Sequence, residues 1–384
     1  MSQLNPTTPS STVEKPQPAT MAGTFAQLWQ KLRQDKIAGA AVLVLVLLYL
    51  AVGFADFLAP YGKHWDRRDV ANAPPSAIYM IDGKTGQWTW PYVLGSKKTF
   101  DRNRYQYVFT PDTEKPYPIE FFCQGTPYRL FGLIPSNVHL FGVASPGWVA
   151  LLGLDMHGRD HFSRLLFGGR ISLTIGFLSL FIAFPLGLLY GGISGYWGGW
   201  IDTAMMRVAE VLMSIPTLYL LISMAAILPA NMPSTLRFAL VVAILAFVGW
   251  AGLSRVVRGM VLSIKNQEFV EAARALGMAD AWIVIRHVLP QTASYVIVAM
   301  TIGVPGYILA ESGLSFLGLG IQQPDASWGN MLKDAQDINN LITRPWMLAP
   351  GFLIFVAVLA FNVVGDAVRD VLDPKSYFKP GKPS

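Results

Sequence analysis

The chain has 384 residues, of which 52% are hydrophobic and only 14% are charged, and its formal net charge is +6 at pH 7. Charged residues make up about 25% of an average soluble protein, so this composition excludes an ordinary soluble domain and favours a membrane protein. The net charge does not indicate nucleic-acid binding, because no segment interleaves basic and aromatic residues as such recognition requires.

The N-terminal residues 1–36 are predicted to form a cytoplasmic tail. Up to Met21 the tail is rich in Pro, Ser, Thr and Gln, a composition typical of disorder. Residues 22–36 are predicted to form a short amphipathic helix on the inner membrane surface. The first apolar run starts too late for a signal peptide and is long enough to span a bilayer, so it is expected to remain as a helix.

Six apolar segments of about twenty residues are predicted to cross the membrane as helices. They are residues 37–58, 171–195, 208–228, 238–257, 293–313 and 347–364. The fold class is therefore predicted to be an all-α integral membrane protein with a core domain over residues 171–372. The fifth span has an alternative end at Gly320, as a tilted or broken helix. Pro185, Pro216 and Pro305 are expected to kink their helices.

Basic residues indicate how the chain is oriented. Two short segments on one side of the predicted spans contain few of them, namely Arg237, Lys333 and Arg344. Because short cytoplasmic loops carry the excess of Lys and Arg, the other side is predicted to be cytoplasmic. This side holds both termini, including the tail 373–384, and the polar loop 265–290.

A long extracytoplasmic insert, residues 59–170, follows the first span. It is rich in aromatic residues, Pro and Gly. Alternating residues at 105–109 and 117–122 predict short strands, and a small subdomain and a cap with little secondary structure remain open alternatives. Cys123 is the only cysteine, which excludes an internal disulfide bond.

Two histidines near the end of the insert have the helical spacing of metal ligands. His157 and His161 lie close to Asp155 and Asp160. Gly158 between them and the position at the membrane edge favour a structural role instead. No Ser-His-Asp or Cys-His set indicates catalysis, so the sequence predicts no metal site, no cofactor and no catalytic residue.

The polar loop 265–290 between two predicted spans has the pattern of a docking element. Helix-forming residues fill its first half, and Gly277 follows where a left-handed residue ends a helix. Asp280 is expected to cap a second short helix that Pro290 ends. Two short helices joined at a glycine form a compact plug for a groove in another protein.

The same loop carries a family resemblance. The residues concerned are Glu271, Ala272, Ala273, Gly277, Leu289 and Pro290. They resemble the EAA loop of ATP-binding-cassette importer permeases, which docks onto the ATPase subunits. His287 stands where the family pattern has Ile, and the branch that imports dipeptides, oligopeptides and nickel often has His there. The resemblance implies that Glu271 anchors the base of the loop and that the two alanines allow close approach.

Two further segments resemble the same branch. Residues 152–173 contain Leu-Gly-Leu-Asp, Gly-Arg-Asp, Ser-Arg and Gly-Arg-Ile-Ser-Leu, and residues 311–329 contain Glu-Ser-Gly-Leu-Ser-Phe-Leu-Gly-Leu-Gly and Ser-Trp-Gly. Leu154 departs from the usual Thr. The charged residues of the first segment are expected to pair at the membrane boundary, namely Asp155, Arg159, Asp160 and Arg164.

Glu311 is the one acidic residue well inside a predicted span, where acidic residues usually have a function. Glu311 and Ser315 are candidates for the translocation path, with Glu311 placed to meet the amino terminus of a peptide. The alternative, which we favour, is a structural hydrogen bond to backbone freed at Gly313. A glycine repeat on the second span predicts close helix packing, within this subunit or at a subunit boundary. It consists of Gly187, Gly191, Gly195 and Gly199.

The resemblance, which covers residues 153–374 and the first helix, implies a permease subunit of an ATP-binding-cassette importer in the bacterial inner membrane. It would form half of the pathway for dipeptides, oligopeptides or related small solutes. The expected partners are a second homologous permease, two ATPase subunits, an extracytoplasmic substrate-binding protein and the lipid bilayer, with no nucleic acid. ATP hydrolysis would reside in the partners, so the chain is not expected to be an enzyme. The substrate itself and the role of residues 60–150 do not follow from the sequence.

The alternative function is a self-sufficient secondary carrier or channel. The predicted spans lack the series of buried Asp, Glu and His residues that ion coupling usually needs, and no inverted repeat is evident. A membrane-anchored scaffold would not need six spans and a docking loop.

Overall fold

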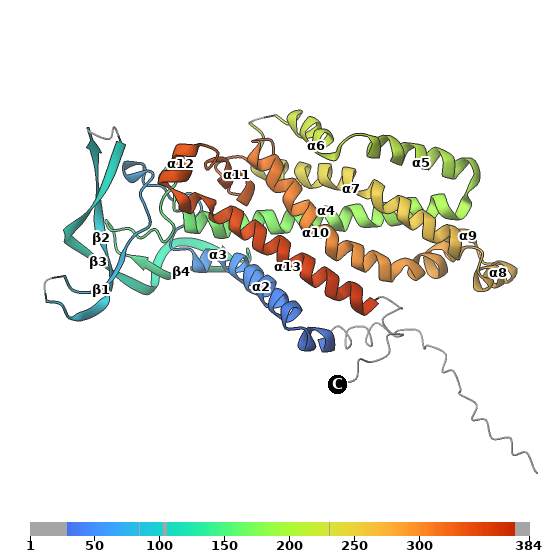
Figure 1. Ribbon diagram of the computed structural model, residues 1–384, viewed down its shortest axis with the longest axis horizontal. Helices are drawn as coiled ribbons and strands as arrows, with labels where there is room; N and C mark the ends of the chain where they lie inside the picture. The colour runs from blue at the N-terminus through green and yellow to red at the C-terminus, as the bar shows by residue number, and fades with distance from the viewer. Residues whose placement is uncertain (1–28, 84, 103–105, 230, 373–384) are drawn as a thin grey trace, which may run out of the picture.

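The computed structural model describes residues 29–372 except 84, 103–105 and 230. The molecule is elongated, with a β-sheet at one end, a bundle of long helices in the middle and two short helices at the other end (Figure 1). The predicted C-terminal tail and residues 1–28 of the predicted N-terminal tail lie outside the described residues. Within the predicted amphipathic helix, residues 29–34 are helical.

Long apolar helices form the bundle. They are α2 (Lys36–Gly53), α4 (His161–Trp197), α7 (Ser234–Ile264), α10 (Ala293–Phe316) and α13 (Ala349–Leu372). In the described residues, five helical stretches are long and apolar enough to cross a membrane, and a sixth is present if the bent pair α5 (Gly199–Ser214) and α6 (Thr217–Ala226) is one span. The prediction of about six membrane helices is therefore confirmed.

The third predicted span is broken rather than straight. α5 and α6 meet at a bend of 85°. Pro216 lies between them with φ −54° and ψ 124°, which is outside the helical region. Proline also disfavours the helical conformation of the residue before it, so Ile215 is extended as well. Pro185 and Pro305, by contrast, lie inside α4 and α10.

Helix α4 begins earlier than predicted. It starts at His161 rather than at residue 171, because Asp160 caps it by accepting a hydrogen bond of 2.7 Å from the backbone N–H of Ser163. The first span is shorter than predicted, since α2 ends at Gly53 and the four-residue helix α3 (Ala55–Leu58) follows.

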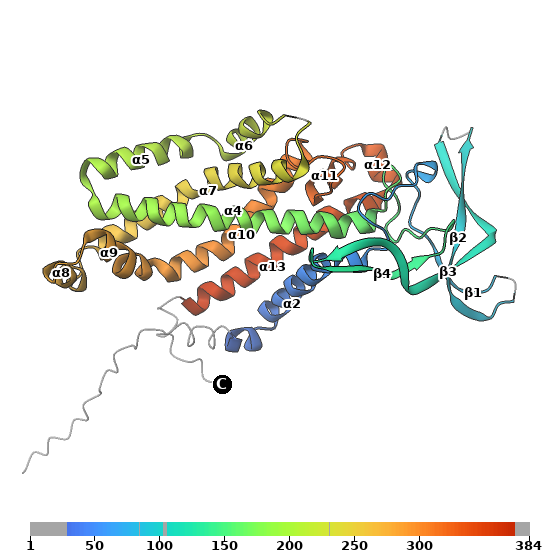
Figure 2. The same ribbon diagram turned by 180° about the vertical axis from the view of Figure 1, so that it is seen from behind.

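The glycine repeat packs α4 against α7 within this chain. The two helices lie side by side (Figure 2). A Cβ atom at Gly187 would come within 2.8 Å of the Trp250 carbonyl oxygen, and one at Gly195 within 2.9 Å of the Arg258 carbonyl oxygen. Close packing in lipid depends on such small residues. Gly199 is the exception, because it lies beyond α4 and opens α5 with φ +56°.

The helices share one apolar core. Leu173 on α4, Ile308 on α10 and Ala357 on α13 are fully buried in the same cluster. Three short elements lie at the end of the bundle nearest the sheet (Figure 1). They are α11 (Trp328–Lys333), α12 (Ile338–Thr343) and a 3-10 turn at Pro345–Leu348.

The insert contains a folded sheet, so the alternative of a cap with little secondary structure is wrong. Four antiparallel strands pair in the order β1-β2-β3-β4. Their bounds are β1 (Ile78–Ile81), β2 (Trp88–Asp101), β3 (Gln106–Leu130) and β4 (Ile134–Val143), with a 3-10 turn at Arg68–Val70 before them. The two short predicted strands are parts of the single strand β3, apart from residue 105, which lies outside the described residues. Val93, Ile119 and Val149 form a small core beneath the sheet.

Candidate functional site

The loop between α7 and α10 forms the end of the molecule opposite the sheet (Figures 1 and 2). It contains α8 (Glu268–Ala275) and α9 (Asp280–Ile283). Glu268 and Glu271 lie in the first turn of α8 and Arg274 in its last turn. This distribution complements the helix dipole and favours the short helix.

A glycine turn joins the two short helices, as predicted. Gly277 has φ +76°, and the N–H of Met278 donates to the Ala273 carbonyl at 3.2 Å, which is the six-to-one bond of a Schellman helix end. Nothing lies within 4 Å of the position of a Cβ at Gly277. A substitution there is therefore opposed by the backbone conformation and not by a collision.

The second half of the loop differs from its prediction. Ala279, and not Asp280, is the N-cap of α9. The chain does not stop at Pro290 but continues through a π turn (Val284–Val288) and a 3-10 turn (Leu289–Thr292) into α10. Pro290 is tolerated because it lies in the first positions of the 3-10 turn, where its missing N–H is not required.

Asp280 has a tertiary role instead. Its carboxylate accepts a hydrogen bond of 2.6 Å from the hydroxyl of Tyr196, the next-to-last residue of α4. The same hydroxyl accepts a bond of 3.2 Å from Arg274, whose guanidinium also lies 3.6 Å from Asp280 and 5.0 Å from the Tyr196 ring centroid. Tyr196 thus binds both short helices of the loop to the end of α4.

Two further contacts fix the loop to α4. Lys265 donates to the carbonyl oxygens of Gly195 at 2.9 Å and Tyr196 at 3.2 Å, so a cation satisfies the C-terminal end of α4. A Cβ at Gly192 would come within 2.8 Å of the Leu289 side chain, so Leu289 packs directly on α4.

The residues of the EAA pattern divide into inward-facing and exposed groups. Ala273 and Leu289 are buried, His287 is half-buried, and Glu271, Ala272, Gly277 and Pro290 are exposed. Glu271 makes no side-chain hydrogen bond or ion pair with any residue that the structure describes. The contacts expected for Glu271 at the base of the loop are therefore not made with the described part of the chain.

Large apolar side chains are exposed on the same loop, which the sequence reading missed. Leu276 is 83% exposed, Ile285 57%, Trp282 54% and Phe269 38%. Phe269 lies on α8 and Trp282 on α9, whereas Leu276 follows α8 and Ile285 lies in the π turn. The only signal in the sequence is that such large apolar residues occur in a segment that also carries charged ones. Exposed apolar side chains that gather on one loop mark a contact with a protein or a membrane.

An ion pair joins α4, α5 and α7 near this end. Arg258 on α7 donates to both carboxylate oxygens of Asp202 on α5, at 2.5 and 2.6 Å, and Ser194 on α4 also donates to Asp202. A cavity of about 210 Å³ lies beside the pair and is lined by Arg207, Glu210 and Arg255 among others. The pair depends on three helices, so no local pattern predicts it.

An apolar cavity of about 400 Å³ lies between α6, α7 and α10. Small residues such as Gly252 and Gly306 line it together with the rings of Tyr295 and Tyr307. No atom lies within 4 Å of a Cβ placed at either glycine, so these positions face open space.

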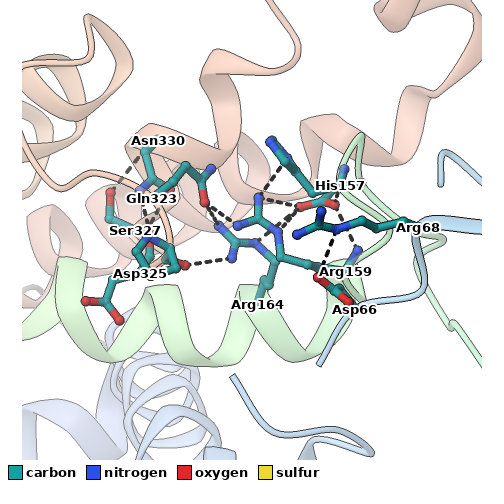
Figure 3. A network of polar contacts seen from close by, with 11 residues as sticks. Asp66, Arg68, His157, Arg159, Arg164, Gln323, Asp325, Ser327 and Asn330 are labelled. Atoms are coloured by element: carbon teal, nitrogen blue, oxygen red, sulfur yellow. Dashed lines mark hydrogen bonds and ion pairs between the residues drawn. The ribbon is translucent and has the colours of Figure 1, made fainter. Parts of the chain in front are cut away.

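A network of polar contacts holds the other end of α4 (Figure 3). Asp155 accepts from Arg159 at 2.7 Å and lies 3.5 Å from Arg164, as predicted. Both arginines also donate to the side-chain oxygen of Gln323, at 2.5 and 3.0 Å. Asp160 does not join these pairs; it caps α4 instead. Its burial raises its pKa to about 7.

The histidines near this network have no shared ligand geometry. His157 Nδ1 lies 3.2 Å from the Arg159 guanidinium, and His161 is buried in the first turn of α4. No group of three or more His, Cys, Asp or Glu side chains suited to a metal ion occurs among the described residues.

Glu311 is fully buried among serine hydroxyls. Ser172 on α4 donates to its carboxylate at 2.8 Å and Ser315 at 2.7 Å. The same hydroxyls accept the backbone N–H groups of Trp328 at 3.1 Å and Ile321 at 3.0 Å. The favoured bond to backbone freed at Gly313 is not made, because α10 runs unbroken to Phe316.

Comparisons with known proteins agree on one family. Residues 183–376 match the family model described as "Binding-protein-dependent transport system inner membrane component", and residues 23–75 match "N-terminal TM domain of oligopeptide transport permease C". The oligopeptide transport system permease protein OppC of Haemophilus influenzae is 39% identical over 266 residues, which cover 68% of this chain and 79% of that protein. The dipeptide transport system permease protein DppC of Bacillus subtilis is 43% identical, with 63% and 71% covered.

A solved structure of the MetNI methionine ABC transporter in inward-facing conformations is also similar, with 22% identity and a TM-score of 0.40. The match covers 53% of this chain and 96% of that chain. This likeness is weak, and the assignment rests on the family model and the two relatives. The chain belongs to the family of inner membrane components of binding-protein-dependent transport systems, which are permease subunits of ATP-binding-cassette importers and transport components rather than enzymes.

Proposed function

We propose that this permease forms half of a translocation pathway for dipeptides, oligopeptides or related small solutes, together with a second, homologous permease. One ATPase subunit docks on the loop 265–290 of this chain, and a second docks on the equivalent loop of the partner permease. An extracytoplasmic binding protein delivers the substrate. The names of the relatives OppC and DppC support the peptide class. The attachment of the loop to α4 through Tyr196 is the observation that carries the coupling role.

The exposed apolar residues of the loop are the proposed contact with the ATPase. Leu276 follows α8 directly, and Trp282 lies on α9, so both short helices contribute. Glu271 and Ala272 lie on the exposed side of α8, where they are available to a partner. His287 and Pro290 extend this surface toward α10.

Closure of the ATPases on ATP moves the loop, and the loop moves α4. Tyr196 and Lys265 transmit this movement, because they bind the loop to the end of α4. Leu289 adds a packing contact at Gly192. Since α4 and α7 are packed along the glycine repeat and linked through Ser194 of α4, Asp202 of α5 and Arg258 of α7, the two helices move as one body.

The apolar cavity between α6, α7 and α10 is the proposed wall of the translocation path. Gly252 and Gly306 leave room, and the tyrosines supply hydroxyl groups for a passing peptide. Glu311, buried among serines, serves to position α4 against α10, and Ser315 takes part in that same junction. This assignment favours the structural alternative for Glu311.

The membrane placement follows the basic residues. Arg255, Lys265, Arg274 and Arg286 lie at the loop end of the bundle, which supports a cytoplasmic loop and cytoplasmic termini in a bacterial inner membrane. The sheet of the insert then lies outside. We divide the chain accordingly into the first helix, the insert and a core permease domain.

Leu276→Glu tests the docking surface. The substitution places a charge in the apolar contact, so the ATPase subunits should be lost when the full assembly is purified through this chain. Ile342→Glu is the matched control, because Ile342 is 73% exposed on α12 at the opposite end of the bundle. Retention of the ATPases by Leu276→Glu at the wild-type level would exclude this surface as the contact.

A further inference from the structure

The turn between β3 and β4 exposes an unusual group of apolar side chains. Leu133 is 82% exposed, Phe131 60% and Ile134 59%. Residues 130–136 read Leu-Phe-Gly-Leu-Ile-Pro-Ser and contain no charged side chain. We call these residues the hairpin tip. In water such a surface is unfavourable, so the hairpin tip requires a covering phase or partner.

The hairpin tip lies beside the end of a membrane helix. The Phe131 ring packs edge-to-face on Phe54 at 5.3 Å, and Phe131 also approaches within 3.7 Å of a Cβ placed at Gly53. Gly53 is the last residue of α2. Further along the hairpin, Phe122 lies 6.2 Å from Phe57 of α3. Both views show β4 next to α3 (Figures 1 and 2).

The exposed face of α2 continues into the hairpin tip. Leu43, Val46, Leu47 and Leu50 of this helix are between 47% and 58% exposed. In a membrane-spanning helix, an exposed apolar face of this kind is suited to contact with lipid. Because Phe54 follows α2 directly and packs on Phe131, the apolar surface runs without a gap from the lipid-facing helix to the hairpin.

Two exposed phenylalanines of the hairpin have a strained backbone conformation. Phe122 has φ +55° and Phe131 has φ +51°, in the left-handed region that non-glycine residues rarely adopt. This conformation costs about 1–2 kcal/mol per residue. Core packing does not explain it, since both rings are mostly exposed. Strained positions of this kind gather at sites with a function.

A polar contact attaches β4 of the hairpin to the chain just after α3. His139 of β4 is buried, and its Nδ1 lies 2.6 Å from the Ala59 carbonyl oxygen just after α3. A cavity of about 520 Å³ beside it is lined by Lys63, His64 and Arg129 among others. The hairpin is therefore amphipathic and anchored at the level where α2 ends, as an interfacial element must be.

We propose that the hairpin tip inserts into the interfacial layer of the lipid leaflet on the sheet side of the membrane. Phenylalanine and leucine favour this layer, and aromatic side chains form belts at it. A protein interface has a rim of polar, hydrogen-bonding side chains around its apolar centre, whereas Ser136 has the only polar side chain among residues 130–136. The proposal depends on α2 crossing the membrane and not on the substrate or on the ATPase contact.

Spin labels on single cysteines measure the depth of the hairpin tip. The complete assembly is reconstituted in lipid bilayers with Cys123→Ser as the background, and a nitroxide is attached at Leu133→Cys. Trp88→Cys is the control, because Trp88 is 81% exposed on β2, away from the hairpin. Power saturation then compares access by oxygen, which concentrates in lipid, with access by a water-soluble nickel chelate.

The expected result is that oxygen reaches the label at position 133 better than the nickel chelate does, with the opposite order at position 88. A second label at Ile134→Cys should repeat the lipid pattern, so that one misplaced side chain does not decide the outcome. Preferential access by nickel at positions 133 and 134 would overturn the proposal. Protection from both reagents would also overturn it, since a protein partner would then cover the tip.

Discussion

A single hydroxyl group joins three elements of this permease. Tyr196 is the next-to-last residue of α4, and its hydroxyl donates to Asp280 of α9 and accepts from Arg274 of α8. The side chains of Arg274 and Asp280 are about half exposed, at 44% and 54%, so their ion pair adds little stability. The contact positions the loop rather than holding the fold together.

Tyr196→Phe should uncouple ATP hydrolysis from transport without dissolving the assembly. The ring and its packing remain, while both hydrogen bonds are lost at a cost of less than about 1 kcal/mol for exposed partners. We expect more ATP hydrolysed per peptide transported, measured in proteoliposomes. Tyr190→Phe is the matched control on the same helix, because the Tyr190 hydroxyl donates to Met205 and not to the loop. Equal coupling in the two variants would refute the role of Tyr196.

Glu311 is expected to stabilise the fold by accepting hydrogen bonds from buried serines. Glu311→Ala leaves the hydroxyls of Ser172 and Ser315 without their acceptor in a buried site, which should cost about 1–3 kcal/mol and lower the Tm of the assembly. Glu311→Gln keeps an acceptor and should be milder. Loss of uptake in Glu311→Gln at an unchanged Tm would instead place the carboxylate on the translocation path.

At the scale of elements, the loop shows what local sequence determines. The end of α8 at Gly277 is a local property, because only a residue that accepts positive φ fits there. The membrane-spanning helices are also determined locally, because each is a run of apolar residues. The hydrogen-bond partner of Asp280 cannot be predicted from local sequence, because Tyr196 lies 84 residues away.

Contacts between residues far apart in the sequence also determine the extent of the sheet and the helical course of the chain past Pro290, so local patterns do not predict either. Only short stretches of the 25-residue strand β3 alternate clearly, and the rest is held by pairing with β2 and β4. Pro290 reads as a helix stop locally, but packing of Leu289 on α4 and burial of Val288 keep the chain helical. The sequence predicts a kink at Pro216, whereas the angle of the bend depends on how α6 packs on α7.

Gly277→Ala tests the conformation of the loop. A methyl group meets no atom there, so the effect should come from positive φ alone, at about 1–2 kcal/mol. We expect a lower yield of ATPase subunits in the purified assembly. Gly259→Ala is the control, since Gly259 of α7 also has open space but lies in a helix, where alanine is favoured. A similar loss in both variants would mean that φ at Gly277 is unimportant.

At the scale of the whole molecule, α4 connects the two ends. Its 37 residues extend over about 55 Å at 1.5 Å per residue. One end is held by Asp160 and the network around Asp155, and the other carries Tyr196. In the proposed mechanism, a movement of the loop reaches the sheet side of the membrane through this one continuous helix.

The most direct test of the coupled-permease account is peptide uptake in proteoliposomes. The chain is reconstituted with its partner permease, the ATPases and the binding protein, and wild type is compared with Gly277→Pro. We predict uptake that requires ATP in the wild type and is lost in Gly277→Pro, because proline cannot adopt the positive φ of Gly277 and the loop then no longer holds the ATPase subunits. Equal uptake by this chain alone, without ATP or partners, would contradict the account and favour a secondary carrier.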